Sequence, residues 1–267
     1  MRKTKIIATL GPATEDPKIL TKLLQRVDVV RINLAHGTWD PKDKANHQKK
    51  IRMVRKISKK IKKPIAILVD LKGNKIRIGN FKNDAIELKK NALVTIRFTE
   101  EEISQSDKEI VVNADYVFDN IAAKDTILLD DGLIRLEVKK IQPKKKALIC
   151  IVHEGGLLLR GKGLEVKNKI INQSGLPEND KKDLKKLAKL DIDWVALSFV
   201  NQASDVNQAR EVLSGFNNHT KLIAKIERIV ALKQLYWIIK ASDGIMVARG
   251  DLALESGPGE LTGLQKN

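Results

Sequence analysis

The sequence predicts an α/β protein built on an incomplete (β/α)8 TIM-type barrel of about six strands. An all-β domain is predicted to be inserted after the third strand. Short apolar runs alternate with amphipathic helical stretches at both ends of the chain, and between about residues 75 and 172 strand-like segments replace this alternation. Alternating strands and helices indicate a parallel sheet, and an abrupt change of pattern indicates a domain boundary.

Residues 1–72 are expected to form the first part of the barrel domain. The predicted strands are the apolar runs KIIATLG (5–11), DVVRINL (28–34) and IAILVDLKG (from 65). Helices are expected over 17–26 and 47–63, and the second has apolar residues three and four positions apart on one face. The third run is apolar throughout, which is typical of a parallel strand buried on both faces.

Residues 73–174 are expected to form the inserted all-β domain. No convincing helical pattern occurs there, and turns rich in Asn, Asp, Gly and Lys separate the strand-like segments. The segments are RIGNF (77–81), IELKK (86–90), ALVTIRF (92–98), EIVVNADYVF (109–118), TILLDDGLIRLEVKKI (126–141) and KKKALICIVHEGG (144–156).

Residues 175–267 return to the first pattern and are expected to form the second part of the barrel. A helix is predicted from Pro177, which suits a first helical position and is followed by acidic residues in the first turn. The later strands are WVALSFV (194–200), KLIAKIE (221–227) and DGIMVARGD (243–251), and helices are expected over 203–213 and 230–241.

The composition favours anionic ligands. The formal net charge is +17, which attracts phosphorylated metabolites, nucleic acid or anionic lipid. Aromatic residues are only 4% of the chain, too few for a surface that stacks many bases, and no apolar run reaches the roughly 18 residues of a membrane span. One cysteine excludes an intrachain disulfide framework. We therefore expect a cytoplasmic protein with neither nucleic acid nor membrane as a partner.

Polar side chains occur at the ends of the predicted barrel strands. The carboxyl ends of barrel strands form the face on which chemistry is done, so these residues are expected to share one site. They are Arg31, Asn33, Asp70, Ser198, Lys225, Glu227, Arg249 and Asp251.

Lys225 has apolar neighbours on both sides in the fifth predicted barrel strand. One interpretation is a structural lysine paired with Glu227. The others are a Schiff-base lysine and a fixed positive charge that clamps a phosphate.

Glu227 and Asp251 are carboxylates at the ends of adjacent predicted strands, a pattern that suits Mg²⁺, and the alternative is a pair of salt bridges. Gly250 permits a tight turn that exposes backbone N–H groups to an anion. His36 follows the second strand in a glycine turn, where a lone histidine is more often structural than a ligand.

Seven motifs, in order, resemble those of the pyruvate kinases. They are TKIIATLGPAT, VVRINLAHG, ILVDLKGNKIR, LLDDGLI, WVALSFV, LIAKIE and SDGIMVARGDLALE. The chain looks like the N-terminal part of such an enzyme, with the family's β-barrel lid as the insert. The resemblance implies transfer of a phosphoryl group from phosphoenolpyruvate to ADP, giving pyruvate and ATP, with Mg²⁺ as cofactor.

The resemblance also implies roles for individual residues. Lys225 would stabilise the transferring phosphoryl group with help from Arg31, and Gly250 and Asp251 would bind substrate. Glu227 and Asp251 would hold Mg²⁺. Residues expected along the nucleotide are Asn33, His36, Arg77 and Lys162.

Departures from the family pattern concern the monovalent cation. Asn33 and Asp70 would remain from the family's K⁺ site, but Ala35 stands where a serine is usual, and Lys75 stands where potassium-dependent members have glutamate. We expect Lys75 to supply the missing cation, so that K⁺ is not required. The alternative is that Lys75 points into solvent.

The resemblance also implies that the chain ends before the family's last two barrel strands and its C-terminal domain. A homotetramer is expected for a full-length member. The competing hypotheses are an inactive truncated product that only binds anions or nucleotides, and a lyase or aldolase that uses Lys225.

Overall fold

The computed structural model describes residues 3–99, 101, 103–104, 106–118, 121–167, 169, 175–257 and 259–266. The chain divides into two compact units. The barrel unit comprises Met1–Gly73 with Gly175–Ala248, and the insert unit comprises Asn74–Ser174 with Arg249–Asn267. This division groups 249–267 with the insert unit and Gly73 with the barrel unit.

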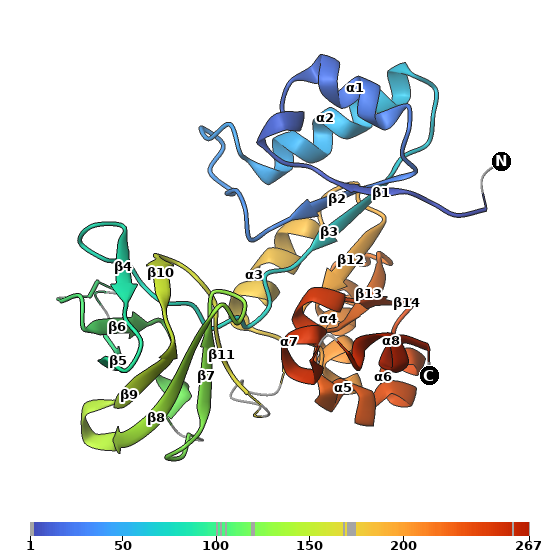
Figure 1. Cartoon of the computed structure of the whole chain (residues 1–267). Helices are drawn as coiled ribbons and strands as arrows, with labels where there is room; N and C mark the ends of the chain where they lie inside the picture. The colour runs from blue at the N-terminus through green and yellow to red at the C-terminus, as the bar shows by residue number, and fades with distance from the viewer. Residues whose placement is uncertain are drawn as a thin grey trace. The chain divides into compact units, whose positions relative to one another are not determined.

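The barrel unit contains a six-stranded parallel sheet in the order β1-β2-β3-β12-β13-β14 (Figure 1). The predicted α/β class, an incomplete TIM-type barrel with six strands in its sheet, is therefore confirmed. The strands are β1 (Ile7–Thr9), β2 (Val29–Asn33), β3 (Ala66–Asp70), β12 (Trp194–Leu197), β13 (Lys221–Ile226) and β14 (Gly244–Val247).

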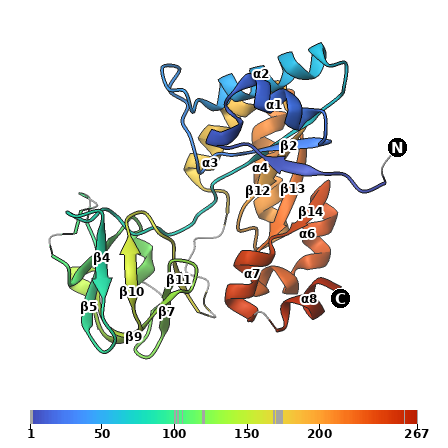
Figure 2. The ribbon, with the colours of Figure 1, turned by 45° about the horizontal axis from the view of Figure 1, so that its top comes forward.

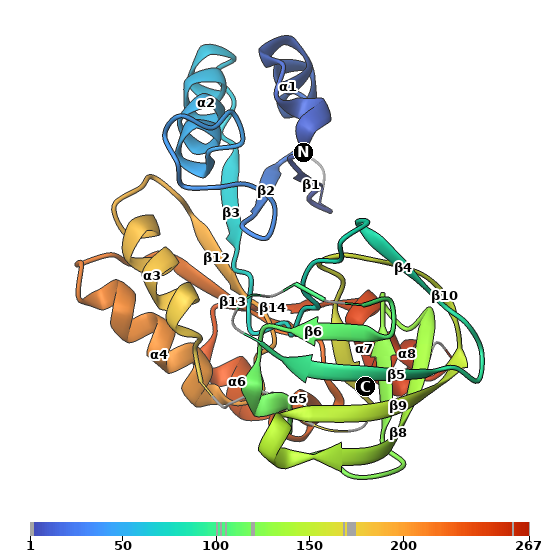
Figure 3. The ribbon, with the colours of Figure 1, turned by 90° about the vertical axis from the view of Figure 1, so that its left-hand side faces the viewer.

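Local sequence explains where the helices of the barrel unit begin. Helix α1 (Pro17–Leu24) has proline in its first turn, and Asp16 accepts hydrogen bonds from the N–H groups of Lys18 and Ile19. Helix α2 (His47–Lys60) is capped by Asn46. Helices α3 (Glu178–Leu187) and α4 (Ala203–Ser214) follow the insert, and Figure 3 shows α1 to α4 beside the sheet.

The helix predicted over 230–241 is wrong in one respect, because the structure divides it into α5 (Ile229–Lys233) and α6 (Leu235–Ala241). Gln234 lies between them with φ −112° and ψ 10°, outside the helical region. No glycine or proline marks this break in the sequence.

The insert unit is built on antiparallel strands (Figure 2). A six-stranded sheet has the order β11-β7-β8-β9-β5-β6, and only its β5–β6 pair is parallel; β10 and β4 form a second, two-stranded sheet. The strands are β4 (Ala85–Leu88), β5 (Leu93–Phe98), β6 (Glu109–Val112), β7 (Thr126–Leu129), β8 (Ile134–Gln142), β9 (Ala147–Glu154), β10 (Gly156–Leu159) and β11 (Leu164–Val166).

Several predicted limits in the insert unit were wrong. The segment 77–81 forms only isolated bridges instead of a strand, and β10 and β11 were missed. The segment 126–141 is a hairpin whose turn has Asp130, Asp131 and Gly132 at positive φ. Short 3-10 turns η2 (Asp115–Phe118) and η3 (Pro143–Lys145) interrupt the strands, as η1 (Pro12–Thr14) follows β1.

Two short helices, α7 (Arg249–Ser256) and α8 (Leu261–Lys266), complete the insert unit. Each unit has its own hydrophobic core, and the two cores share no residue. None of the described helices is both long enough and apolar enough to cross a bilayer.

Candidate active site

A network of charged side chains lies at the carboxyl ends of four neighbouring barrel strands. The ammonium group of Lys225 lies 2.8 Å from Oε1 of Glu227 and 3.4 Å from Oδ1 of Asp70. It also donates a hydrogen bond of 2.8 Å to the hydroxyl of Ser198. We call Arg31, Asp70, Ser198, Lys225 and Glu227 the strand-end cluster.

Asp70 links two cations in this cluster. Its Oδ2 accepts a hydrogen bond of 2.8 Å from Nε of Arg31 and a second one from Nη2. Asp70 is only 1% exposed, and Ser198 donates to its Oδ1 over 3.3 Å. A buried carboxylate held by two cations fixes both in place, because neither side chain can leave without exposing an uncompensated charge.

The environment of Lys225 keeps its ammonium charged. Burial lowers the pKa of Lys225, but the carboxylates of Glu227 and Asp70 raise it by more, so the net shift is upward. A Schiff-base lysine needs a neutral amine and therefore a lowered pKa. The cluster thus favours a fixed positive charge over the lyase or aldolase hypothesis, and the predicted Lys225–Glu227 ion pair is present.

Glu227 is held by the backbone as well as by Lys225. Its Oε2 accepts a hydrogen bond of 2.6 Å from the N–H of Phe199. Phe199 has φ +57°, a strained value for a residue other than glycine, and the guanidinium of Arg228 lies 5.0 Å from its ring centre. The sequence motifs did not single out Phe199, and its apolar type gives no signal of this conformation.

Gly73 ends the barrel segment that precedes the insert, and it passes close to this part of the cluster. It has φ +67°, and a Cβ at this position would lie 2.7 Å from Cβ of Ser198 and 2.7 Å from Cδ2 of Phe199. Its N–H donates a hydrogen bond of 3.0 Å to the buried Asp180. Both the backbone angle and the close contact therefore require glycine here.

Asn33 and His36 lie at the end of β2 but outside the strand-end cluster. Oδ1 of Asn33 accepts a hydrogen bond of 2.9 Å from the N–H of Ala35, and the N–H of His36 donates to the carbonyl of Asn33. His36 is exposed. Among the described residues, neither side chain makes a hydrogen bond or ion pair with the cluster.

The remaining predicted site residues belong to the insert unit. The ammonium of Lys75 lies 3.2 Å from Asp131, 3.4 Å from Asp251 and 3.8 Å from Glu165. Lys75 is therefore not a solvent-pointing side chain, which corrects the alternative that it is. Separately, Lys162 pairs with Asp130 at 2.6 Å, Arg77 donates to the carbonyl of Gly161, and Gly250 lies in the first turn of α7.

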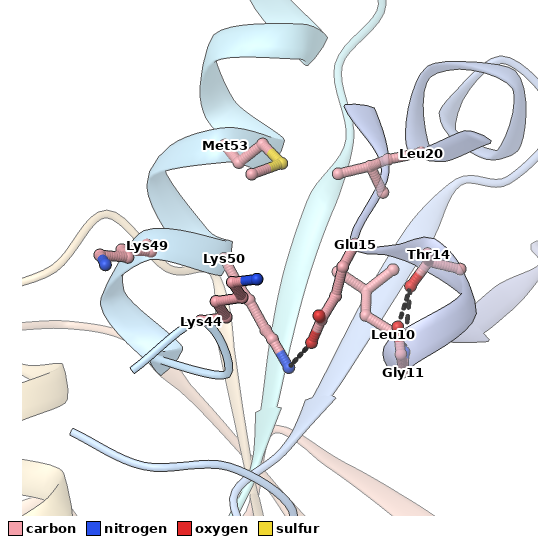
Figure 4. Close-up of a pocket in the computed structure, with 9 residues that line it drawn as sticks. All are labelled: Leu10, Gly11, Thr14, Glu15, Leu20, Lys44, Lys49, Lys50 and Met53. Carbon is pink, nitrogen blue, oxygen red and sulfur yellow. Dashed lines mark hydrogen bonds and ion pairs between the residues drawn. The ribbon is translucent and has the colours of Figure 1, made fainter. Parts of the chain in front are cut away.

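A cavity of about 280 Å³ opens in the barrel unit between the end of β1 and helix α2 (Figure 4). Its walls are mainly apolar. Lys50 reaches Glu15 across it at 3.3 Å, and Thr14 exchanges hydrogen bonds with the backbone of Gly11. The lining residues are Leu10, Gly11, Thr14, Glu15, Leu20, Lys44, Lys49, Lys50 and Met53. The cavity was not predicted, because no motif joins these residues.

Comparisons with known proteins identify the family. A family profile described as "Pyruvate kinase, barrel domain" matches residues 1–267. The chain belongs to the pyruvate kinase family. It is 36% identical over 269 residues to a pyruvate kinase of Staphylococcus saprophyticus, covering 100% of this chain and 45% of the relative. It is 37% identical to a pyruvate kinase of Geobacillus stearothermophilus, over 99% of this chain and 44% of the relative.

The chain spans less than half the length of these curated relatives. A divalent cation implied by the family would need oxygen ligands. Glu227 in the barrel unit and Asp251 in the insert unit each carry a carboxylate of that kind. Oδ1 of Asp251 accepts a hydrogen bond from the ammonium of Lys75, whereas its Oδ2 makes no hydrogen bond with any of the described residues. In the described part of the chain no three His, Cys, Asp or Glu side chains form a metal site, so waters or substrate oxygens would complete the shell.

Proposed function

We propose that the strand-end cluster binds phosphoenolpyruvate and supports transfer of its phosphoryl group to ADP, giving pyruvate and ATP. The observation that carries this proposal is a buried, charged Lys225 held beside Arg31 by the shared carboxylate of Asp70. Phosphoryl transfer mainly requires that the protein position the reactants and place positive charge around the transferring phosphoryl group. The cluster supplies both from a rigid parallel sheet.

Lys225 and Arg31 would contact the phosphoryl group, and Asp70 would act by positioning them. Glu227 and Asp251 would hold Mg²⁺, which when bound neutralises charge on the phosphate and on the oxygen that develops charge. Gly250 and Asp251 would bind the substrate beside the metal. These roles are supported by the family's motifs at the same positions in the sequence.

The nucleotide is proposed to lie along Asn33 and His36, with Arg77 and Lys162 as further contacts. The lysine-lined cavity adds a candidate for part of this ligand. Its apolar walls suit a base, and its ammonium groups suit phosphate. A complete family member is proposed to form a homotetramer.

We further propose that the reaction does not require K⁺. Ala35 offers no side-chain oxygen, while Lys75 carries a compact positive charge on a flexible side chain. Assays in a tetramethylammonium salt should show the same rate with and without added K⁺. A large activation by K⁺ would contradict the proposal. The double variant Lys75→Glu with Ala35→Ser should become K⁺-dependent, and the single variant Lys75→Glu should not.

The test of the function is direct. Purified chain should bind phosphoenolpyruvate and ADP by isothermal titration calorimetry. Pyruvate formation, coupled to NADH oxidation by lactate dehydrogenase, is expected of a length-restored protein, whereas the 267-residue chain itself is expected to have little or no activity. Binding of both ligands without turnover in the length-restored protein would favour the alternative of an anion- or nucleotide-binding protein, which the +17 charge also supports. Failure to bind phosphoenolpyruvate would overturn the proposed site.

A further inference from the structure

Lys75 is the centre of an ion-pair network inside the insert unit. Its side chain is 18% exposed, and its ammonium faces Asp131, Glu165 and Asp251. The three carboxylates come from the turn after β7, from β11 and from the first turn of α7. One ammonium group therefore forms ion pairs with three carboxylates that belong to separate elements.

The backbone is shaped to let Lys75 reach this position. A Cβ on Gly163 would lie 2.5 Å from Cε of Lys75, so any larger residue at 163 would displace the lysine chain. From this position its ammonium reaches three carboxylates, at 3.2 Å from Asp131, 3.4 Å from Asp251 and 3.8 Å from Glu165.

Asp251 is the carboxylate in this network that the proposed function also assigns to the divalent cation. Its Oδ1 lies 3.4 Å from Lys75, and it is one-third exposed. A carboxylate already neutralised by an ammonium binds a second cation less tightly, because the two positive charges repel each other at short range. Lys75 is thus in position to oppose metal binding at Asp251.

We propose that Lys75 is a built-in counter-ion of Asp251 that competes with the divalent cation for this carboxylate. The inference rests on the proposed function, in which Asp251 is a metal ligand. Lys75 neutralises Asp251 while the metal is absent, and metal binding requires the ammonium to shift toward Asp131 and Glu165. The three carboxylates let this shift occur without leaving Lys75 unpaired.

The experiment measures Mn²⁺ binding to the 267-residue chain by electron paramagnetic resonance, without substrate and without an activity readout. We expect Lys75→Met to tighten Mn²⁺ binding about two- to fivefold, the size expected for a partly exposed ion pair. Lys75→Arg should keep the wild-type dissociation constant to within about twofold. Lys139→Met is the matched control, because it removes a lysine paired with Glu137 in the same unit and should leave Mn²⁺ binding unchanged.

A second variant tests the inference in the opposite direction. Asp131→Asn removes one competitor for the ammonium, so Lys75 should hold Asp251 more firmly and Mn²⁺ binding should weaken. Unchanged Mn²⁺ binding in both Lys75→Met and Asp131→Asn would overturn the inference, and if Lys75→Met fails to fold, Asp131→Asn decides alone.

Asp251→Asn separates this failure from failure of the proposed function. If Asp251→Asn leaves Mn²⁺ binding unaltered, the metal assignment itself is wrong. If Asp251→Asn weakens binding while the two variants above change nothing, only the role of Lys75 is wrong.

Discussion

At the scale of single residues, Lys225 depends on its neighbours for both its position and its charge. Because its pKa is raised by the carboxylates beside it, its value to the proposed reaction is electrostatic. Lys225→Met keeps the bulk and removes the charge. We expect kcat to fall about 10²- to 10³-fold with a much smaller change in KM, as for other preorganised charges aimed at a transition state.

The matched control for this prediction is Lys221→Met, at the opposite end of the same strand. Lys221 is exposed and lies over the ring of Trp194, 5.2 Å from its centre. It should leave both kinetic constants within about twofold of the parent values. Equal losses in the two variants would mean that Lys225 acts through the stability of β13 and not on the phosphoryl group.

At the scale of elements, the first turns of α2 and α3 each hold a buried titratable group. Burial is the main cause that lowers the pKa of His47 to about 4, and Lys50 and Lys72 add to it. Burial is also the main cause that raises the pKa of Asp180 to about 6. Neither nitrogen of His47 has a hydrogen-bond partner among the described residues.

His47 and Asp180 make the stability of the fold depend on pH in opposite directions, over nearly the same pH range. The folded pKa of His47 lies below its unfolded value, so stability falls as pH decreases from about 6.5 to 4. The folded pKa of Asp180 lies above its unfolded value, so stability falls as pH increases from about 4 to 6. His47 and Asp180 each change the free energy of unfolding by about 3 kcal/mol at most over this pH range. Because the two changes have opposite signs, they nearly cancel in the parent chain.

Substitution should reveal each contribution separately. With Asp180→Asn, which keeps an acceptor for the N–H of Gly73, the melting temperature should drop more steeply than in the parent between pH 6.5 and 4. With His47→Phe, which keeps a ring against Trp39, the melting temperature should instead increase as the pH decreases from 6.5 to 4. Thermal unfolding followed by circular dichroism provides the measurement, and identical pH profiles for the parent and both variants would contradict the assignment.

Some elements of the fold could be predicted from the sequence, and others could not. All six barrel strands were predicted from their short apolar runs. In β3, β12 and β13 these runs reflect burial on both faces, whereas the edge strands β1 and β14 are partly exposed. The break at Gln234 and the strands β10 and β11 were not predicted. No local sequence signal marks them, because they depend on tertiary packing. Similarly, strand-end positions identified Arg31, Asp70, Ser198, Lys225 and Glu227 as candidates. The strained Phe199 and the triple pairing of Lys75 depend on contacts between distant segments, which spacing does not encode.

At the scale of the whole molecule, two separate cores predict two separable unfolding transitions. The buried clusters of the barrel unit and the insert unit share no residue. All three tryptophans, Trp39, Trp194 and Trp237, belong to the barrel unit. Tryptophan fluorescence therefore reports on that unit alone, whereas far-ultraviolet circular dichroism reports on both.

A core substitution in one unit should accordingly move only one of these signals. Leu136→Ala removes a fully buried side chain from the insert core and should cost about 2–5 kcal/mol there. We expect the circular dichroism transition to broaden toward lower temperature while the fluorescence midpoint stays fixed. Leu24→Ala, in the barrel core and equally buried, should lower the fluorescence midpoint. If Leu136→Ala lowers the fluorescence midpoint as much as Leu24→Ala does, the two units unfold as one cooperative structure, and separate cores do not make separate folding units in this chain.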